Sequence, residues 1–137
     1  MATVTMNGSD NVAIEKTPRW LVFNVDFSAD TATTTAALRV LPVGTVVLDG
    51  WMNCVTAEAG GTSADVDMEV GAVGWWTGTA DNGGVINVFD HGASKYQYVV
   101  VAGTAASRTV EAIWTEAGTS TAGPVMRVGV LVYRPDF

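Results

Sequence analysis

The sequence has very little of the two residues on which disulfide frameworks and much metal chemistry depend. Its 137 residues include one cysteine, Cys54, and one histidine, His91. A single cysteine cannot form an internal disulfide bond, so we expect a protein that folds without oxidation and is made in a reducing compartment. A single histidine excludes a metal centre that is built from several converging histidine ligands.

Charged residues are also scarce, and basic residues are the scarcest. Charged residues make up 15% of the chain, with 7 Lys and Arg against 14 Asp and Glu, which gives a formal net charge of −7. Nucleic acids and anionic membranes are recognised through basic patches, so this balance argues against both as partners. No apolar run approaches the roughly 18 residues of a membrane helix, and residues 1–6 lack the features of a signal peptide.

The abundant residues are β-branched. The chain has 22 Val and 17 Thr but only 5 Leu and 3 Ile, a balance that favours strands over helices. Segments of alternating polarity recur about every 10–15 residues with turn signals between them, and none has a helical period. We therefore expect an all-β fold, a single-domain antiparallel jelly-roll or Greek-key β-sandwich of about eight strands over residues 18–137. Residues 1–17 are predicted to be a loosely held N-terminal arm with one short strand around residues 12–14.

The predicted strands cover residues 19–27, 36–41, 45–56, 64–70, 85–89, 96–102, 109–115 and 125–133. The alternation in 19–27 predicts a core face made of Leu21, Phe23, Val25 and Phe27. In residues 64–70, Ala64, Val66, Met68 and Val70 alternate with acidic residues, which predicts one dry and one wet face. Gly50, inside 45–56, indicates a bulge or a close backbone approach.

The polar residues form no recognisable catalytic set. A Ser-His-Asp site would have to combine His91 with Ser94 or Ser63, and the sequence has no Gly-x-Ser-x-Gly turn. Gly71 and Gly74 are too close together for a phosphate-binding loop and no lysine follows them. We expect no enzyme activity, no cofactor and no metal.

The acidic residues allow only weak alternatives. Carboxyl groups of Asp65, Asp67 and Glu69 would stand about 6.8 Å apart along one strand face, so a solvated face is favoured over a cation site or an interface. A glycosidase pair drawn from three further glutamates is conceivable, but no spacing selects one; these are Glu58, Glu111 and Glu116.

Five tryptophans are the main candidates for binding. Trp75 and Trp76 are consecutive, so on a regular strand they would point to opposite faces and one would be exposed. The exposed indole would anchor a subunit or partner interface, pack under a loop or stack on a sugar ring. Cys54 alternates with Met52 on an apolar face, which predicts a buried, inert thiol.

Two segments carry a resemblance to a known group of proteins. The first is LPVGTVVLDGWMNCVTA at 41–57 with GGTSADVDMEVG at 60–71, and the second is AGTSTAGP at 117–124 leading into VGVLVY at 128–133. Together they resemble small jelly-roll virion proteins of tailed bacteriophages, many of which are head decoration, or cement, proteins. The resemblance covers about half of the chain, mainly the β core.

This resemblance implies a structural role on the phage particle. Such proteins bind the outside of the capsid, often as trimers, and bridge neighbouring capsomers, so the implied partners are the major capsid protein and two further copies of the chain. The implied location is the capsid surface, after synthesis in the host cytoplasm. The alternative is a carbohydrate- or receptor-binding module of a phage tail or head fibre. The interface candidates are Val12 and Ile14 in the arm and Trp51, Trp75, Trp76 and Trp114 in the strands.

Overall fold

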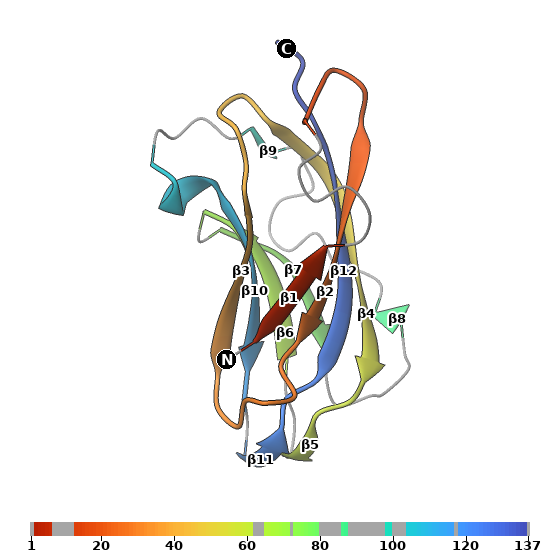
Figure 1. The fold of residues 1–137 in the computed structure, drawn as a ribbon, viewed down its shortest axis with the longest axis vertical. Helices are drawn as coiled ribbons and strands as arrows, with labels where there is room; N and C mark the ends of the chain where they lie inside the picture. The colour runs from red at the N-terminus through yellow and green to blue at the C-terminus, as the bar shows by residue number, and fades with distance from the viewer. Residues whose placement is uncertain are drawn as a thin grey trace.

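The computed structural model describes residues 2–6, 13–61, 65–71, 73–79, 86–87, 98–99, 104–116 and 118–136, with only the backbone given for Met6, 73–79, 86–87 and 98–99. In these ranges the regular structure consists of antiparallel strands and one short 3-10 turn, η1 (Ala106–Arg108). Figure 1 shows the strands gathered into two sheets that face each other. The prediction of an all-β sandwich is confirmed.

Within the described residues the strands form two main sheets and a short ribbon. The six-stranded sheet contains β1 (Thr3–Met6), β2 (Arg19–Asp26), β12 (Val125–Tyr133), β4 (Val46–Thr56) and β8 (Ile86–Asn87) in that order, with β9 (Tyr98–Val99) also paired to β4. The four-stranded sheet runs β3 (Thr34–Val40), β10 (Thr109–Thr115), β6 (Asp65–Val70) and β7 (Val73–Thr79). The ribbon pairs β5 (Ala59–Gly61) with β11 (Gly118–Ala122).

The strand pairs are nested in the sequence, and this nesting identifies the topology. From the outermost pair inward they are β2–β12, β3–β10, β4 with β8 and β9, and β6–β7. Successive pairs alternate between the six-stranded and the four-stranded sheet. A long antiparallel pair of chain segments that is rolled up in this way is a jelly roll.

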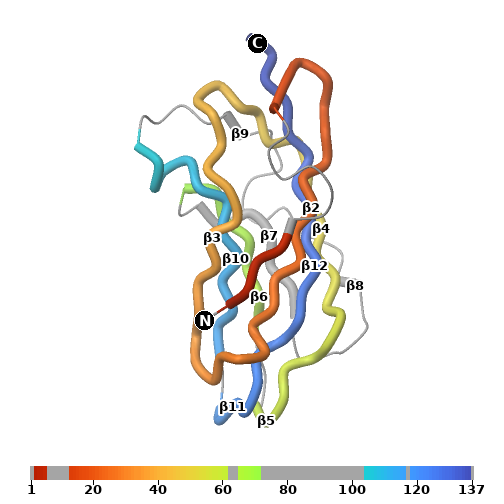
Figure 2. Tube along the Cα trace, viewed as in Figure 1, coloured from red at the N-terminus to blue at the C-terminus, as the bar shows by residue number. Residues whose placement is uncertain are grey.

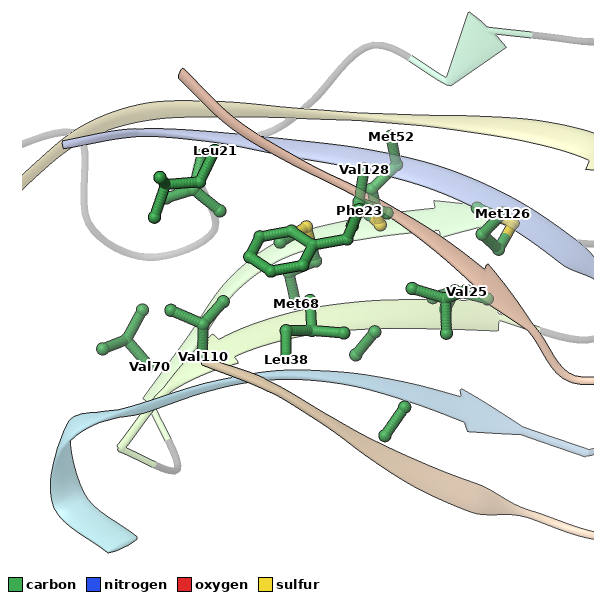
Figure 3. Close-up of a cluster of buried hydrophobic side chains, with 14 of the residues drawn as sticks. Leu21, Phe23, Val25, Leu38, Met52, Met68, Val70, Val110, Met126 and Val128 are labelled. Atoms are coloured by element: carbon green, nitrogen blue, oxygen red, sulfur yellow. The ribbon is translucent and has the colours of Figure 1, made fainter. Parts of the chain in front are cut away.

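The core lies between the inner faces of the two sheets (Figure 3). The predicted face of β2 is buried, with exposed fractions of 3% for Leu21 and 0% for Phe23 and Val25. Val66, Met68 and Val70 of β6 are also fully buried, as their alternation predicted. Met52 of β4 and Met68 of β6 lie near the ring of Phe23, and Met126 of β12 lies beside Val25, because unbranched side chains adapt to irregular gaps between β-branched neighbours.

β4 contains a bulge, but the bulge does not lie at Gly50, where the sequence suggested one. The register with β12 passes from Leu131–Asp49 to Val132–Val47, so Leu48 is an extra residue and Val46 and Val47 are both buried. The bulge therefore lies two residues before Gly50 and interrupts the alternation that the sequence suggests. Four strands were not predicted at all, namely β1, β5, β7 and β11.

The N-terminal segment also differs from its prediction, because its described parts are attached to the sandwich. The strand lies at Thr3–Met6, where alternating β-branched residues pair with β2, whereas residues 13–15 form no strand. β1 lies at the edge of the sandwich, where it pairs with β2 of one sheet and also contacts β3 of the other (Figure 1). Ile14 is 2% exposed in the core, and the carbonyl of Glu15 accepts the Arg134 N–H at 2.7 Å. Val12 lies outside the described residues.

This attachment predicts a clear cost for truncating Ile14. Ile14→Ala removes a buried side chain and should lower the free energy of unfolding by about 2–5 kcal/mol, measured by urea denaturation. Lys16→Ala is the matched control, because Lys16 is exposed and should leave the midpoint nearly unchanged. Equal midpoints for the two variants would show that this segment does not contribute to the core.

Candidate interaction surface

The outer face of the six-stranded sheet carries the most distinctive group of described surface side chains. Residues that alternate with the core residues of β2, β12 and β4 point to this side. We call this group the open face; it consists of Trp20, Val22 and Asn24 of β2, Arg127, Gly129 and Leu131 of β12, and Asp49, Trp51 and Asn53 of β4.

The register arranges the open face in three rows across the strands. Trp20, Leu131 and Asp49 form the first row. The second row is Val22, Gly129 and Trp51, and the third is Asn24, Arg127 and Asn53. The first two rows are apolar except at Asp49, and the third is entirely polar, so an apolar area borders a line of amide and guanidinium groups.

The second row contains a close contact between Trp51 and Gly129. A Cβ atom added at Gly129 would collide with the Nε1 edge of the Trp51 indole, with Cζ2 only 2.8 Å away. The indole of Trp51 therefore leans from β4 across the sheet onto β12, and it can do so because position 129 has no side chain. Trp51 remains partly exposed.

Trp20 is the most exposed tryptophan whose side chain is described, with an exposed fraction of 44%. It is the second residue of β2, on the side opposite to Leu21, and its neighbour in the first row is Leu131. It was not among the predicted interface residues, although the same alternation that assigned Leu21 to the core would have placed Trp20 outside.

Two predicted interface residues are core residues instead. Trp114 is 0% exposed, its ring centroid lies 6.2 Å from that of Phe27, and it packs closely against Gly123. It falls on the buried side of β10 together with Val110 and Ala112, so its indole faces the opposite sheet. Trp114 and Ile14 offer no surface to a partner, which corrects the expectation for both.

Trp75 and Trp76 lie on β7, but their side chains are outside the described part. The backbone register passes from Met68–Trp76 to Glu69–Gly74, so Trp75 is an extra residue at a bulge. Simple alternation, which would place the two indoles on opposite faces, does not apply at such a point. His91, Ser63 and Ser94 also lie outside the described residues.

The outer face of the four-stranded sheet is acidic. Glu69 of β6 stands opposite Glu111 of β10, and Asp67 follows on the same side of β6. Burial raises the pKa of Glu69, and the nearby charges of Glu111 and Asp67 raise it further. Among the described residues no group of three or more His, Cys, Asp or Glu side chains is arranged to hold a metal ion.

The two other candidate glutamates act as hydrogen-bond acceptors at the end of the sandwich. The Ser120 hydroxyl donates to Glu58 Oε2 at 2.6 Å, and the Ser120 N–H donates to Glu116 Oε1 at 3.0 Å. The bond to Glu58 links β11 to the residue before β5, whereas the bond to Glu116 is local to the segment that leads into β11. Ser120 itself is only 6% exposed. We call the pair β5 and β11 the end ribbon; it lies at the end of the molecule away from the C-terminus (Figure 2).

Cys54 is fully buried, as its alternation with Met52 predicted, and its thiol donates to the Thr56 carbonyl at 3.4 Å. In the part of the chain that the structure describes, no pocket opens at the surface and no helix has the length and apolarity of a membrane span.

Comparisons with models of protein families, with curated proteins and with solved structures found no match to this chain. The fold is established by the strand order and register of the chain itself.

Gly129→Ala tests the packing of Trp51. The new methyl group must displace the indole, so we expect a loss of about 1–3 kcal/mol in the free energy of unfolding and a red-shifted tryptophan emission. In a Trp51→Ala background the same substitution should cost less than about 1 kcal/mol, because the clash is gone. An equal cost in both backgrounds would disprove the contact.

Glu69→Gln tests the acidic face through its dependence on pH. Since the pKa of Glu69 is raised from 4.5 in the folded state, its ionised form destabilises the fold, and this penalty appears as the pH rises through the raised value. The variant should be more stable than the natural chain at pH 7, by less than about 1 kcal/mol, and equally stable well below pH 4.5.

Asp26→Asn is the control, because its effect on stability at pH 7 should be opposite to that of Glu69→Gln. The Ser28 hydroxyl and the Ser28 N–H, which lies 2.8 Å from Asp26 Oδ1, lower the pKa of this carboxyl below 3.8. The variant should be less stable at pH 7, and the difference should vanish as the pH falls through the lowered value. Denaturation series from pH 7 to pH 3 measure the stability of both variants relative to the natural chain. If the two stability differences changed with pH in the same direction, the opposite pKa shifts of Glu69 and Asp26 would be contradicted.

Proposed function

We propose that this protein is a non-enzymatic structural protein of a tailed-phage virion, which binds the outer capsid surface as a decoration protein and bridges capsomers. The observation that carries the proposal is where the two resembling segments lie. β4 and β12, one from each segment, are paired at the centre of the six-stranded sheet, and β5 and β11 are paired in the end ribbon. Segments that are far apart in sequence thus form one continuous part of the molecule.

The end ribbon is the contact element that this proposal favours. Ala59, Gly60, Gly118, Thr119 and Thr121 are all exposed on it. The bond from Ser120 to Glu58 restrains the two strands of the ribbon relative to each other, which reduces the conformational entropy that is lost when a partner binds. Small side chains allow its backbone to approach a capsid subunit closely.

Clamping of the shell would then follow from multiple contacts. A homotrimer engages several capsid sites at once, so its avidity exceeds the affinity of each copy. A protein that binds only the assembled shell stabilises that shell by mass action. Closed threefold assembly needs two different surface patches on every copy, and exposed Trp20 beside Leu131 is a suitable apolar anchor for one of them.

The alternative is a carbohydrate- or receptor-binding module of a phage fibre, which the aromatic open face favours. The two functions predict different results when the protein is mixed with empty capsids and no glycan. A decoration protein sediments with empty capsids in the absence of any glycan, whereas a fibre module does not.

Co-sedimentation with empty capsids of the phage that encodes the protein tests the proposed function. The natural chain should pellet with the capsids and saturate, and Thr119→Lys, which places a long charged side chain on the end ribbon, should weaken binding by about tenfold or more. Thr35→Lys is the matched control, because Thr35 is an exposed threonine on β3 of the four-stranded sheet and not on the end ribbon. Absence of the natural chain from the pellet would refute the proposal.

Light scattering after gel filtration tests the trimer. The expected mass is about three times the 14.3 kDa of one chain. Trp20→Ser should shift the mass toward that of the monomer, and because the residue is 44% exposed in the single chain the variant should still fold, as checked by its denaturation midpoint. Val55→Ser, at another exposed apolar position of the six-stranded sheet, should leave the mass unchanged. A monomeric natural chain would contradict trimer formation in solution.

A further inference from the structure

β1 is attached to the sandwich mainly through its backbone. It pairs with β2 over four residues and also contacts β3 of the other sheet (Figure 1). Ala2 and Val4 pack against the core but are only partly buried, and Thr3 and Thr5 are exposed. Releasing β1 from β2 therefore uncovers little apolar surface and costs mainly the backbone pairing of one short strand.

The outer edge of β2 depends on β1 for its partner. β12 pairs with the other edge of β2, and β1 is the only described strand on this side. An uncovered strand edge presents backbone N–H and C=O groups that accept another strand. β1 of a second copy has the identical sequence and fits in the identical register, so the contacts that are lost within one chain are regained between two chains.

The chain between β1 and the rest of the molecule is long enough for such an exchange. Ile14 lies in the core and the Glu15 carbonyl accepts the Arg134 N–H, so each copy is anchored from these residues onward. Seven peptide steps separate Met6 from Ala13, and they span at most about 25 Å. This reach exceeds twice the roughly 10 Å that separates two packed sheets, so β1 can extend to a neighbouring copy.

A second contact between the copies is also needed, because the same short connection favours pairing of β1 with its own β2. Trp20 is 44% exposed, lies beside Leu131 and belongs to β2 itself. A copy that docks on Trp20 therefore brings its β1 close to the edge that is to receive it. The donated strand and the accepting edge are two different patches on every copy, as closed threefold assembly requires.

We infer that β1 of each copy pairs with β2 of the next copy, so that three copies form a closed ring with exchanged N-terminal strands. The register is the one seen within the single chain, with Thr5 opposite Asn24. This inference rests on the proposed homotrimer and names the contact that closes it. Each copy then holds its neighbour through a strand of the sheet, so the ring opens only when a β1 strand leaves that sheet.

Disulfide trapping between two chains of different size tests the exchange. Both chains carry Cys54→Ala; one carries Thr5→Cys, and the other, lengthened by a C-terminal tag, carries Asn24→Cys. Opposite residues of antiparallel strands have Cα atoms about 4.5–5.5 Å apart, which is within the range of a disulfide bond. When the two chains are produced together and oxidised, we expect a disulfide-linked product of one tagged and one untagged chain.

The matched control replaces Asn24→Cys by Val55→Cys, an exposed position on β4, which is separated from β2 by β12. It should give at least about tenfold less of the mixed product, because Val55 is not opposite β1. A single chain with both Thr5→Cys and Asn24→Cys reports the arrangement of the copies. The ring predicts a covalent trimer on a non-reducing gel, whereas pairing within each chain predicts a monomer with an internal disulfide.

Each outcome decides the inference. The mixed product together with the covalent trimer supports it. Disulfides confined to single chains, free thiols after oxidation, or a covalent dimer as the end product overturn it. The mass of the natural chain from light scattering is scored separately. A trimeric mass with disulfides confined to single chains refutes the exchange and leaves the proposed trimer standing, whereas a monomeric mass refutes the trimer and the exchange with it.

Discussion

The pairing of β12 with both β2 and β4 is the constraint on which the rest of the structure depends. β12 is the last strand of the sequence, and it inserts between two strands from the first half of the chain. Val125 lies opposite Asp26, so the pairing joins residues that are about a hundred positions apart. Closing such a long loop costs conformational entropy, which the buried faces of all three strands offset together.

Both faces of the six-stranded sheet follow from this pairing. On the inner side, Val128 and Val130 are fully buried in the core between the two sheets. On the outer side, Gly129 leaves the space that the indole of Trp51 occupies. A one-residue shift of β12 would exchange the two sides and would destroy both the core and the open face. The end ribbon depends on the same register, because β4 leads into β5 and β11 leads into β12.

The two outer faces of the sandwich differ in chemistry. One face combines tryptophan, aliphatic and guanidinium groups, and the other places Glu69 opposite Glu111. The pKa of Glu69 is raised first by its burial and then by the nearby charges of Glu111 and Asp67.

The sequence by itself determined the all-β class and the inner faces of its clearest strands. Valine and threonine are stiff at χ1 and favour strands, and alternation assigned Phe23, Val66 and Met68 to the core because a strand has only two sides. The same local rules could have placed Trp20 outside and Trp114 inside. Only the tertiary structure decided where β12 inserts, that Leu48 is a bulge, that Ile14 enters the core and that Trp51 rests on Gly129. Each of these depends on a partner strand or cavity far away in the chain, and periodicity in one segment carries no information about which distant segment lies beside it.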